Sequence, residues 1–304
     1  MKTRSRFLKY GVLSILILLA VPVGLYVYMV LGSDNSVLPE SHGKVVSQLF
    51  MGDESNLPLI VGLGGAEGGN AWASNYWKTQ RDDFIQQGYA FLALGYFGLE
   101  GAPKELDRIA LEGVYQAIIA AAEESNINRK CIAVIGASKG AELALLLASH
   151  YSAIKTVIAI VPGHAVFAGL TAAMNTSSFS LNNEPLPFVP VPWSATPALI
   201  KGDLRAAWEH MLKDQEAVER AAIPVEKING PIYFVSATED EFWPSSEMSD
   251  VMMKRLEDNN FAHYVQHTAI EGDHASPLAH FDAIEDFLNT HFRSKSSENC
   301  GEPL

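Results

Sequence analysis

The sequence predicts an α/β fold in which a mostly parallel sheet carries helices on both faces. Two observations support this prediction. Continuous apolar runs, such as LPLIVGL (57–63) and CIAVIG (131–136), end in or before glycine, as strands buried on both faces of a parallel sheet do. Segments with helical periodicity separate these runs, and alternation of strands and helices with short links is typical of parallel sheets.

The elements can be assigned in chain order. We expect strands over 44–50, 57–63, 89–96, 131–136, 156–161, 231–237 and 263–270, and helices over 74–88, 104–125, directly after Ser138, near 246–258 and over 278–292. Residues 162–200 interrupt this order, because a regular helix or a central strand is prevented by their prolines, among them Pro185, Pro187, Pro190, Pro192 and Pro197. This segment follows the C-terminal end of a strand, where open α/β sheets bind ligands, so we interpret it as a lid or pocket wall, with an inert surface loop as the alternative.

The chain divides into four parts. Residues 1–33 form a basic segment and a membrane anchor, 34–56 a link and first strand, 57–293 the main domain, and 294–304 a polar tail. Residues 10–32 are uncharged and long enough to cross a bilayer as a helix. A cleaved signal peptide is the alternative, but its apolar core is usually shorter and precedes an A-x-A-like site. The basic residues before the anchor predict a cytoplasmic N-terminus and a main domain on the other side of the membrane.

Charge and cysteine content exclude several classes of function. Residues 1–33 carry a charge of +4, so the remainder of this −13 chain carries −17. An acidic domain repels phosphate backbones, which argues against nucleic-acid binding. The two cysteines, Cys131 and Cys300, form neither a disulfide framework nor a zinc-binding spacing, and Cys131 is expected to be a small buried side chain. A single disulfide between these distant residues is the alternative, which the sequence does not support.

A serine between two glycines stands at the junction of an expected strand and helix. The stretch Gly136-Ala137-Ser138-Lys139-Gly140 matches G-x-S-x-G, the nucleophile elbow that exposes a serine hydroxyl above a sheet. An ordinary turn with Ser138 as the helix N-cap is the alternative. A nucleophilic serine needs a base, and that base needs an orienting acid.

The acid and the base are expected after later strands, in the order Ser, acid, His. Strand 231–237 is followed by three carboxylates, Glu239, Asp240 and Glu241, among which spacing cannot choose. Strand 263–270 is followed by His274, the candidate base. His263 and His267 lie within that strand and are interpreted as packing or surface residues.

Stabilisation of an oxyanion requires N–H donors near the serine. We expect one donor to be the N–H of Lys139 and the other to come from the glycine-rich loop after strand 57–63, at Gly65 or Ala66. A phosphate-binding loop is the rival interpretation, but the motif G-x-x-x-x-G-K-[ST] is absent. Candidate substrate-binding residues are Glu67, His164 and Trp243.

Four stretches resemble a known family: LIVGLGGAEGG (59–69), IGASKGAELALLLAS (135–149), IPVEKINGPIYFVSATEDEFWPS (223–245) and GDHASP (272–277). They are similar to the catalytic C-terminal domain shared by acyl-CoA thioesterases and bile acid-CoA:amino acid N-acyltransferases, a branch of the α/β hydrolases related to dienelactone hydrolases. The resemblance implies an α/β-hydrolase fold, with Ser138 as nucleophile, Asp240 as acid and His274 as base. The family's acyl-CoA enzymes carry a β-rich domain ahead of the catalytic one, where this chain has an apolar segment and a short link.

The resemblance implies a serine hydrolase of thioesters or carboxylic esters, similar to acyl-CoA thioesterases, that needs no metal or organic cofactor. The conjugating members of the family carry cysteine in the elbow, so serine at position 138 favours water as the acyl acceptor. Two alternatives stay open: an acyltransferase that passes the acyl group to an amine or alcohol, and a binding protein that keeps the fold without turnover.

Overall fold

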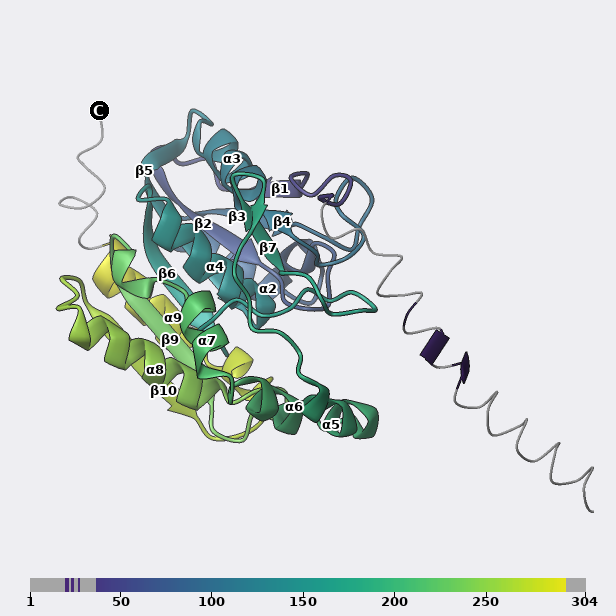
Figure 1. Cartoon of the computed structure of the whole chain (residues 1–304). Coiled ribbons are helices and arrows are strands. Elements are labelled where there is room, and N and C mark those ends of the chain that lie inside the picture. Colours follow the sequence, from purple (N-terminus) through teal and green to yellow (C-terminus); the bar gives the residue numbers. More distant parts are fainter. Residues whose placement is uncertain (1–19, 22, 25–26, 28–36, 294–304) are drawn as a thin grey trace, which may run out of the picture.

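The computed structural model describes residues 20–21, 23–24, 27 and 37–293. A seven-stranded sheet forms its centre, in the order β1-β3-β2-β5-β6-β9-β10 (Figure 1). β1 pairs antiparallel with β3, and every other neighbouring pair in this sheet is parallel. The strands are β1 (Val46–Phe50), β2 (Leu57–Leu63), β3 (Ala90–Gly95), β5 (Ile127–Ala137), β6 (Ile154–Ile160), β9 (Ile232–Ala237) and β10 (Val265–Ile270).

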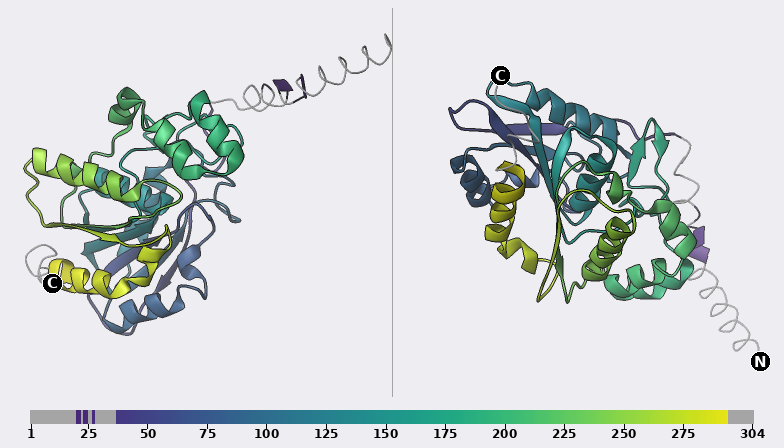
Figure 2. Two further views of the ribbon diagram at one scale, coloured as in Figure 1. Left: turned by 90° about the horizontal axis from the view of Figure 1, so that it is seen from below. Right: turned by 90° about the vertical axis from the view of Figure 1, so that its left-hand side faces the viewer.

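Helices cover both faces of the sheet (Figure 2, right). One face carries α3 (Leu111–Ala122), α4 (Lys139–His150) and α8 (Ser245–Asp258), and the other carries α2 (Lys78–Gln86) and α9 (Phe281–Phe287), which continues as a π-helical turn over Leu288–Arg293. Successive side chains of a strand point to opposite faces. In β2, Leu59 and Val61 therefore join the core under α3 and α4, whereas Ile60 joins the core under α2 and α9. The predicted α/β architecture is confirmed.

One predicted helix is too long at its start. The expected helix 104–125 begins only at Leu111, because Ile109–Ala110 form a short strand, β4, that pairs with β7 (Phe179–Leu181). Arg108 has a φ of 48°, which a right-handed helix does not accommodate. Leu106 and Ile109 are buried, as the helical pattern predicted. Leu106 lies in a loop, however, and Ile109 lies in the small sheet.

The proline-rich segment contains only short elements. β7 pairs with β8 (Glu184–Pro185) and β4 in a three-stranded sheet, and α5 (Thr196–Lys201) follows a 3-10 turn at Trp193–Ala195. Two further helices, α6 (Leu204–Met211) and α7 (Gln215–Ala221), were not predicted. Their N-caps are Asp203 and Asp214, whose side chains accept backbone N–H bonds from Ala206 and Ala217. Aspartate before a helical run is the signal that could have revealed them.

The predicted membrane anchor, residues 10–32, lies almost wholly outside the described residues, and so do the rest of the basic segment and the polar tail after residue 293. In the part of the chain that the structure does describe, no helix is both long and apolar enough to cross a membrane. Cys131 is fully buried in β5, as expected, but it is disulfide-bonded, which the sequence did not indicate, and Cys300 lies outside the described residues.

Candidate active site

Ser138 occupies a sharp turn between β5 and α4. Its backbone has φ 54° and ψ −120°, a conformation that non-glycine residues rarely adopt and that persists where the surroundings enforce it. Both flanking glycines are required by close approach of the backbone: a β-carbon on Gly136 would lie 2.1 Å from the Gly140 carbonyl oxygen, and one on Gly140 would lie 2.3 Å from the Gly64 carbonyl oxygen. Ser138 makes no capping hydrogen bond with its side chain. Ser138 thus occupies the N-cap position of α4, but side-chain capping does not account for the serine.

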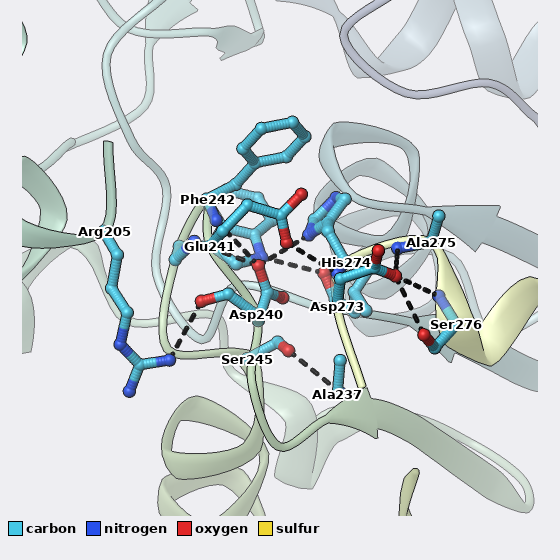
Figure 3. Close-up of polar contacts among 12 residues, drawn as sticks. Arg205, Ala237, Asp240, Glu241, Phe242, Ser245, Asp273, His274, Ala275 and Ser276 are labelled. Atoms are coloured by element: carbon cyan, nitrogen blue, oxygen red, sulfur yellow. Dashed lines mark hydrogen bonds and ion pairs between the residues drawn. The ribbon is translucent and has the colours of Figure 1, made fainter. Parts of the chain in front are cut away.

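His274 contacts Asp240 across two loops that follow neighbouring strands. The Nδ1 atom of His274 lies 2.8 Å from Oδ1 of Asp240 (Figure 3). Asp240 follows β9 and His274 follows β10, so the parallel pairing of these strands brings their C-terminal loops together. The other two carboxylates of the acidic run are exposed, and Glu241 accepts a hydrogen bond from the backbone N–H of His274 at 2.8 Å.

The contacts of Asp240 favour its ionised form although the side chain is completely buried. Burial opposes its ionisation, but the bond and charge interaction with His274, together with hydrogen bonds from Ser245 and the Trp243 backbone, outweigh this effect, and the pKa of Asp240 is lowered. Oδ1 accepts the N–H groups of Phe242 at 3.0 Å and Trp243 at 3.2 Å in addition to His274. Three donors therefore converge on one carboxylate oxygen. With Nδ1 bonded to Asp240, the basic nitrogen of neutral His274 is Nε2.

Ser138 and His274 line the same pocket, which has a volume of about 550 Å³. The glycine-rich loop contributes Gly64, Gly65, Ala66 and Glu67 to its wall. Most of the remaining wall is apolar or aromatic and consists of Leu63, Ala71, Trp72, Ser74, Tyr76, Trp77, Ala137, Val161, Phe242 and Leu278. The aromatic side chains were not identified from the sequence, although the stretch AWASNYW (71–77) directly after the glycine-rich loop could have indicated them.

The candidate oxyanion donors lie around Ser138. A β-carbon on Gly65 would lie 3.3 Å from Cβ of Ser138, so the glycine-rich loop runs directly beside the serine. The N–H of Gly65 donates to Oε1 of Glu67 at 3.0 Å. Lys139 is the first residue of α4, where backbone N–H groups have no partner within the helix.

The side chain of Lys139 points away from the pocket and forms a buried ion pair. Its Nζ lies 2.6 Å from Oε2 of Glu142, and both side chains are almost fully buried. The other oxygen of Glu142 accepts the backbone N–H of Phe167 at 3.1 Å. This pair therefore connects the nucleophile turn to the segment that begins at residue 162. The sequence did not indicate it, because Lys and Glu three residues apart on a helix usually lie on its surface.

Two of the candidate substrate-binding residues do not contribute to the pocket wall. Trp243 is buried, and its ring N–H donates to the Val161 carbonyl at 3.1 Å. Its ring packs on Phe167 and Trp208 of the proline-rich and α6 segments. His164 is also buried, and burial lowers its pKa to about 4, so the ring is neutral at physiological pH. Neither side chain is among the residues that line this pocket, so their role in substrate binding stays a prediction, whereas Glu67 does line the pocket.

A hydrogen-bonded Ser–His–Asp arrangement exists away from this pocket. His267 in β10 contacts Oγ of Ser236 through Nε2 at 2.7 Å and Oδ1 of Asp250 through Nδ1 at 3.1 Å. Ser236 is completely buried in β9, so its hydroxyl cannot meet a substrate. Ser138, by contrast, is partly exposed and borders the pocket. Of these two serines, Ser138 is therefore the one that a substrate can reach.

Comparison with known proteins assigns the family. Residues 112–274, more than half of the chain, match the family model described as BAAT / Acyl-CoA thioester hydrolase C terminal. Mitochondrial acyl-coenzyme A thioesterase 2 of Mus musculus is 26% identical over 227 residues, which cover 72% of this chain and 45% of that protein. Acyl-coenzyme A amino acid N-acyltransferase 1 of Mus musculus is 27% identical over 215 residues, covering 70% and 47%. The chain thus spans about half the length of the curated relatives it matches.

Solved structures agree on the fold. Est1E from Butyrivibrio proteoclasticus, solved with ferulic acid, superposes with a TM-score of 0.53 at 18% identity, covering 81% of this chain and 94% of that one. The acylaminoacyl peptidase of Pyrococcus horikoshii superposes with a TM-score of 0.56 at 13% identity, covering 82% and 39%. The chain has an α/β-hydrolase fold and belongs to the BAAT / acyl-CoA thioester hydrolase C-terminal family.

Proposed function

We propose that the protein is a serine hydrolase of thioesters or carboxylic esters that works through an acyl-enzyme on Ser138. One observation carries this proposal: His274, bonded to the buried Asp240, lines the same pocket as a serine held at a positive φ. A serine with strained backbone, a histidine whose tautomer is set by a carboxylate, and an accessible pocket are features typical of nucleophilic catalysis by serine.

The reaction would proceed in two halves. Nε2 of His274 accepts the proton of the Ser138 hydroxyl while Oγ attacks the acyl carbonyl, and the resulting imidazolium is stabilised by Asp240. N–H groups of Lys139 and of the Gly65–Ala66 region would hold the oxyanion. The imidazolium then protonates the leaving thiol or alcohol. Water, deprotonated by His274, attacks the acyl-enzyme and releases the acid.

Covalent labelling tests the nucleophile. A fluorophosphonate probe should label the wild-type protein at Ser138, because this hydroxyl borders the pocket that His274 also lines, whereas Ser236 is buried beyond the reach of the probe. The Ser138→Ala variant should not be labelled, while Ser236→Ala, which alters the buried Ser236–His267–Asp250 arrangement, should be labelled like the wild type. Absence of an adduct on the wild type, or equal labelling of Ser138→Ala, would rule out the proposed nucleophile and leave the binding-protein alternative.

The leaving group can be examined with two thioesters of one acyl chain. The described residues lining the pocket include the carboxylate of Glu67 but no lysine or arginine that could bind the phosphates of coenzyme A. We therefore expect kcat/KM for an acyl-CoA to lie within a few-fold of that for the matching N-acetylcysteamine thioester, which lacks the phosphates. A preference for the CoA ester of more than tenfold would contradict this expectation.

An acyltransferase is the second candidate, since one relative is an amino acid N-acyltransferase. The same thioester assay distinguishes the two functions when an amino acid is added. Serine at position 138 favours hydrolysis, so thiol release should be accompanied by free acid and not by an amide. The predicted anchor over 10–32, with the main domain outside the cytoplasm, stays a prediction.

A further inference from the structure

The carboxylate of Glu67 lies at the glycine-rich loop, beside Ser138. Its Oε1 accepts the Gly65 N–H at 3.0 Å, and its Oε2 would lie 2.9 Å from a β-carbon placed on Gly65. The same β-carbon would lie 3.3 Å from Cβ of Ser138. All three residues border the same pocket. A negatively charged oxygen of the protein therefore sits on a backbone donor next to the nucleophile.

The peptide that carries this donor is held at its opposite end. The carbonyl of Gly64 and the N–H of Gly65 belong to one planar peptide group and point in opposite directions. The buried hydroxyl of Tyr96 donates to the Gly64 carbonyl at 2.7 Å. Burial raises the pKa of Tyr96 well above its ordinary value, and the charges of Glu67 and Glu142 add to this effect, so the phenol remains a donor. Tyr96 thereby keeps the Gly65 N–H directed at Glu67.

We propose that the Glu67 carboxylate occupies the place of the substrate's carbonyl oxygen, and that a substrate must displace it before Ser138 attacks. The inference rests on the proposed hydrolase function. The nitrogen of Gly65 lies 3.0 Å from Oε1 of Glu67, and the same distance is expected between an oxyanion and the N–H donor that stabilises it. A carboxylate and an oxyanion cannot share this donor, because both are negative and both need the same hydrogen.

The side chain has room to leave. Glu67 is exposed to solvent, and the two residues after it, Gly68 and Gly69, have φ values of 67° and 72° that favour glycine. A change of side-chain rotamer would carry the carboxylate into water without moving Gly65, which Tyr96 holds. Glu67 thus raises the cost of the acylation step while the donor geometry is preserved.

The rate of phosphonylation tests this role, since a fluorophosphonate places its P=O oxygen in the oxyanion site. We expect Glu67→Ala to raise the second-order labelling rate of Ser138 about tenfold, equivalent to about 1.4 kcal/mol. Glu67→Gln should give a smaller increase, because a neutral amide oxygen still accepts the Gly65 N–H, though more weakly. Glu100→Ala, which removes another exposed carboxylate, is the matched control and should label like the wild type.

The outcomes separate the inference from the proposed function. Wild-type protein that does not label at all contradicts the hydrolase proposal itself. Wild-type labelling together with unchanged or slower labelling of both Glu67 variants overturns the inference alone, and slower labelling with a lower melting temperature would show that Glu67 holds the loop in shape. Faster labelling with an unchanged melting temperature supports displacement.

Discussion

Asp240→Ala should lower kcat for ester hydrolysis by about 10⁴-fold, the order of loss that follows removal of the acid from a Ser–His–Asp triad. The variant removes the oxygen that orients Nδ1 of His274 and the charge that stabilises the imidazolium. The loss should appear mainly in kcat, because Asp240 is buried and lines no part of the pocket. Steady-state kinetics with an activated aryl ester measures it.

Asp240→Asn should lose less activity than Asp240→Ala. The donors from His274, Phe242 and Trp243 all converge on Oδ1, so an asparagine that places its carbonyl oxygen there keeps these bonds and loses only the charge. The matched control is Asp250→Ala, the equivalent change in the Ser236–His267–Asp250 arrangement, which should keep kcat within about twofold of the wild type. Equal losses in Asp240→Ala and Asp250→Ala would mean that the assignment of the acid is wrong.

Lys139→Met should lower the free energy of unfolding by about 3–5 kcal/mol, because it leaves the charge of Glu142 buried without an opposite charge beside it. Burial lowers the pKa of Lys139 and raises that of Glu142, and in each case the opposite charge counteracts the shift. The loss should also loosen the contact between Glu142 and the Phe167 N–H, which ties the proline-rich segment to the nucleophile turn. Urea unfolding followed by circular dichroism measures the effect.

Two further variants make this result specific. In Lys139→Met/Glu142→Gln the buried charge is gone and the amide oxygen can still accept from Phe167, so most of the stability should return. Lys254→Met breaks an exposed ion pair with Asp258 and should leave the free energy of unfolding almost unchanged, because solvent screens this pair. If Lys139→Met were as stable as Lys254→Met, the buried pair would not contribute as described.

Much of the fold could be predicted because strands of a buried parallel sheet have a local signature. The range predicted for β2 agrees with the structure at both ends, and those for β3, β9 and β10 agree within two residues. The start of α3 could not be predicted, since the apolar spacing of 104–110 is satisfied equally by a helix face and by pairing with β7. The helices α6 and α7 were not predicted because the segment before them is rich in proline, although the cap residues Asp203 and Asp214 indicate where they begin.

The sequence by itself determined which chemistry the site can hold. The motif G-x-S-x-G needs its glycines because a backbone carbonyl lies against each of them. A serine, an acid and a histidine each follow a strand of one sheet, and the C-terminal ends of these strands meet at one edge of that sheet. Only the tertiary structure decided among similar side chains. It brought the carboxylate of Asp240, which the family resemblance but not the spacing had singled out, to the ring of His274. It also buried Trp243 and His164, and it set the carboxylate of Glu67 on the Gly65 N–H. These choices depend on burial and on contacts between residues distant in the chain, which local sequence patterns do not encode.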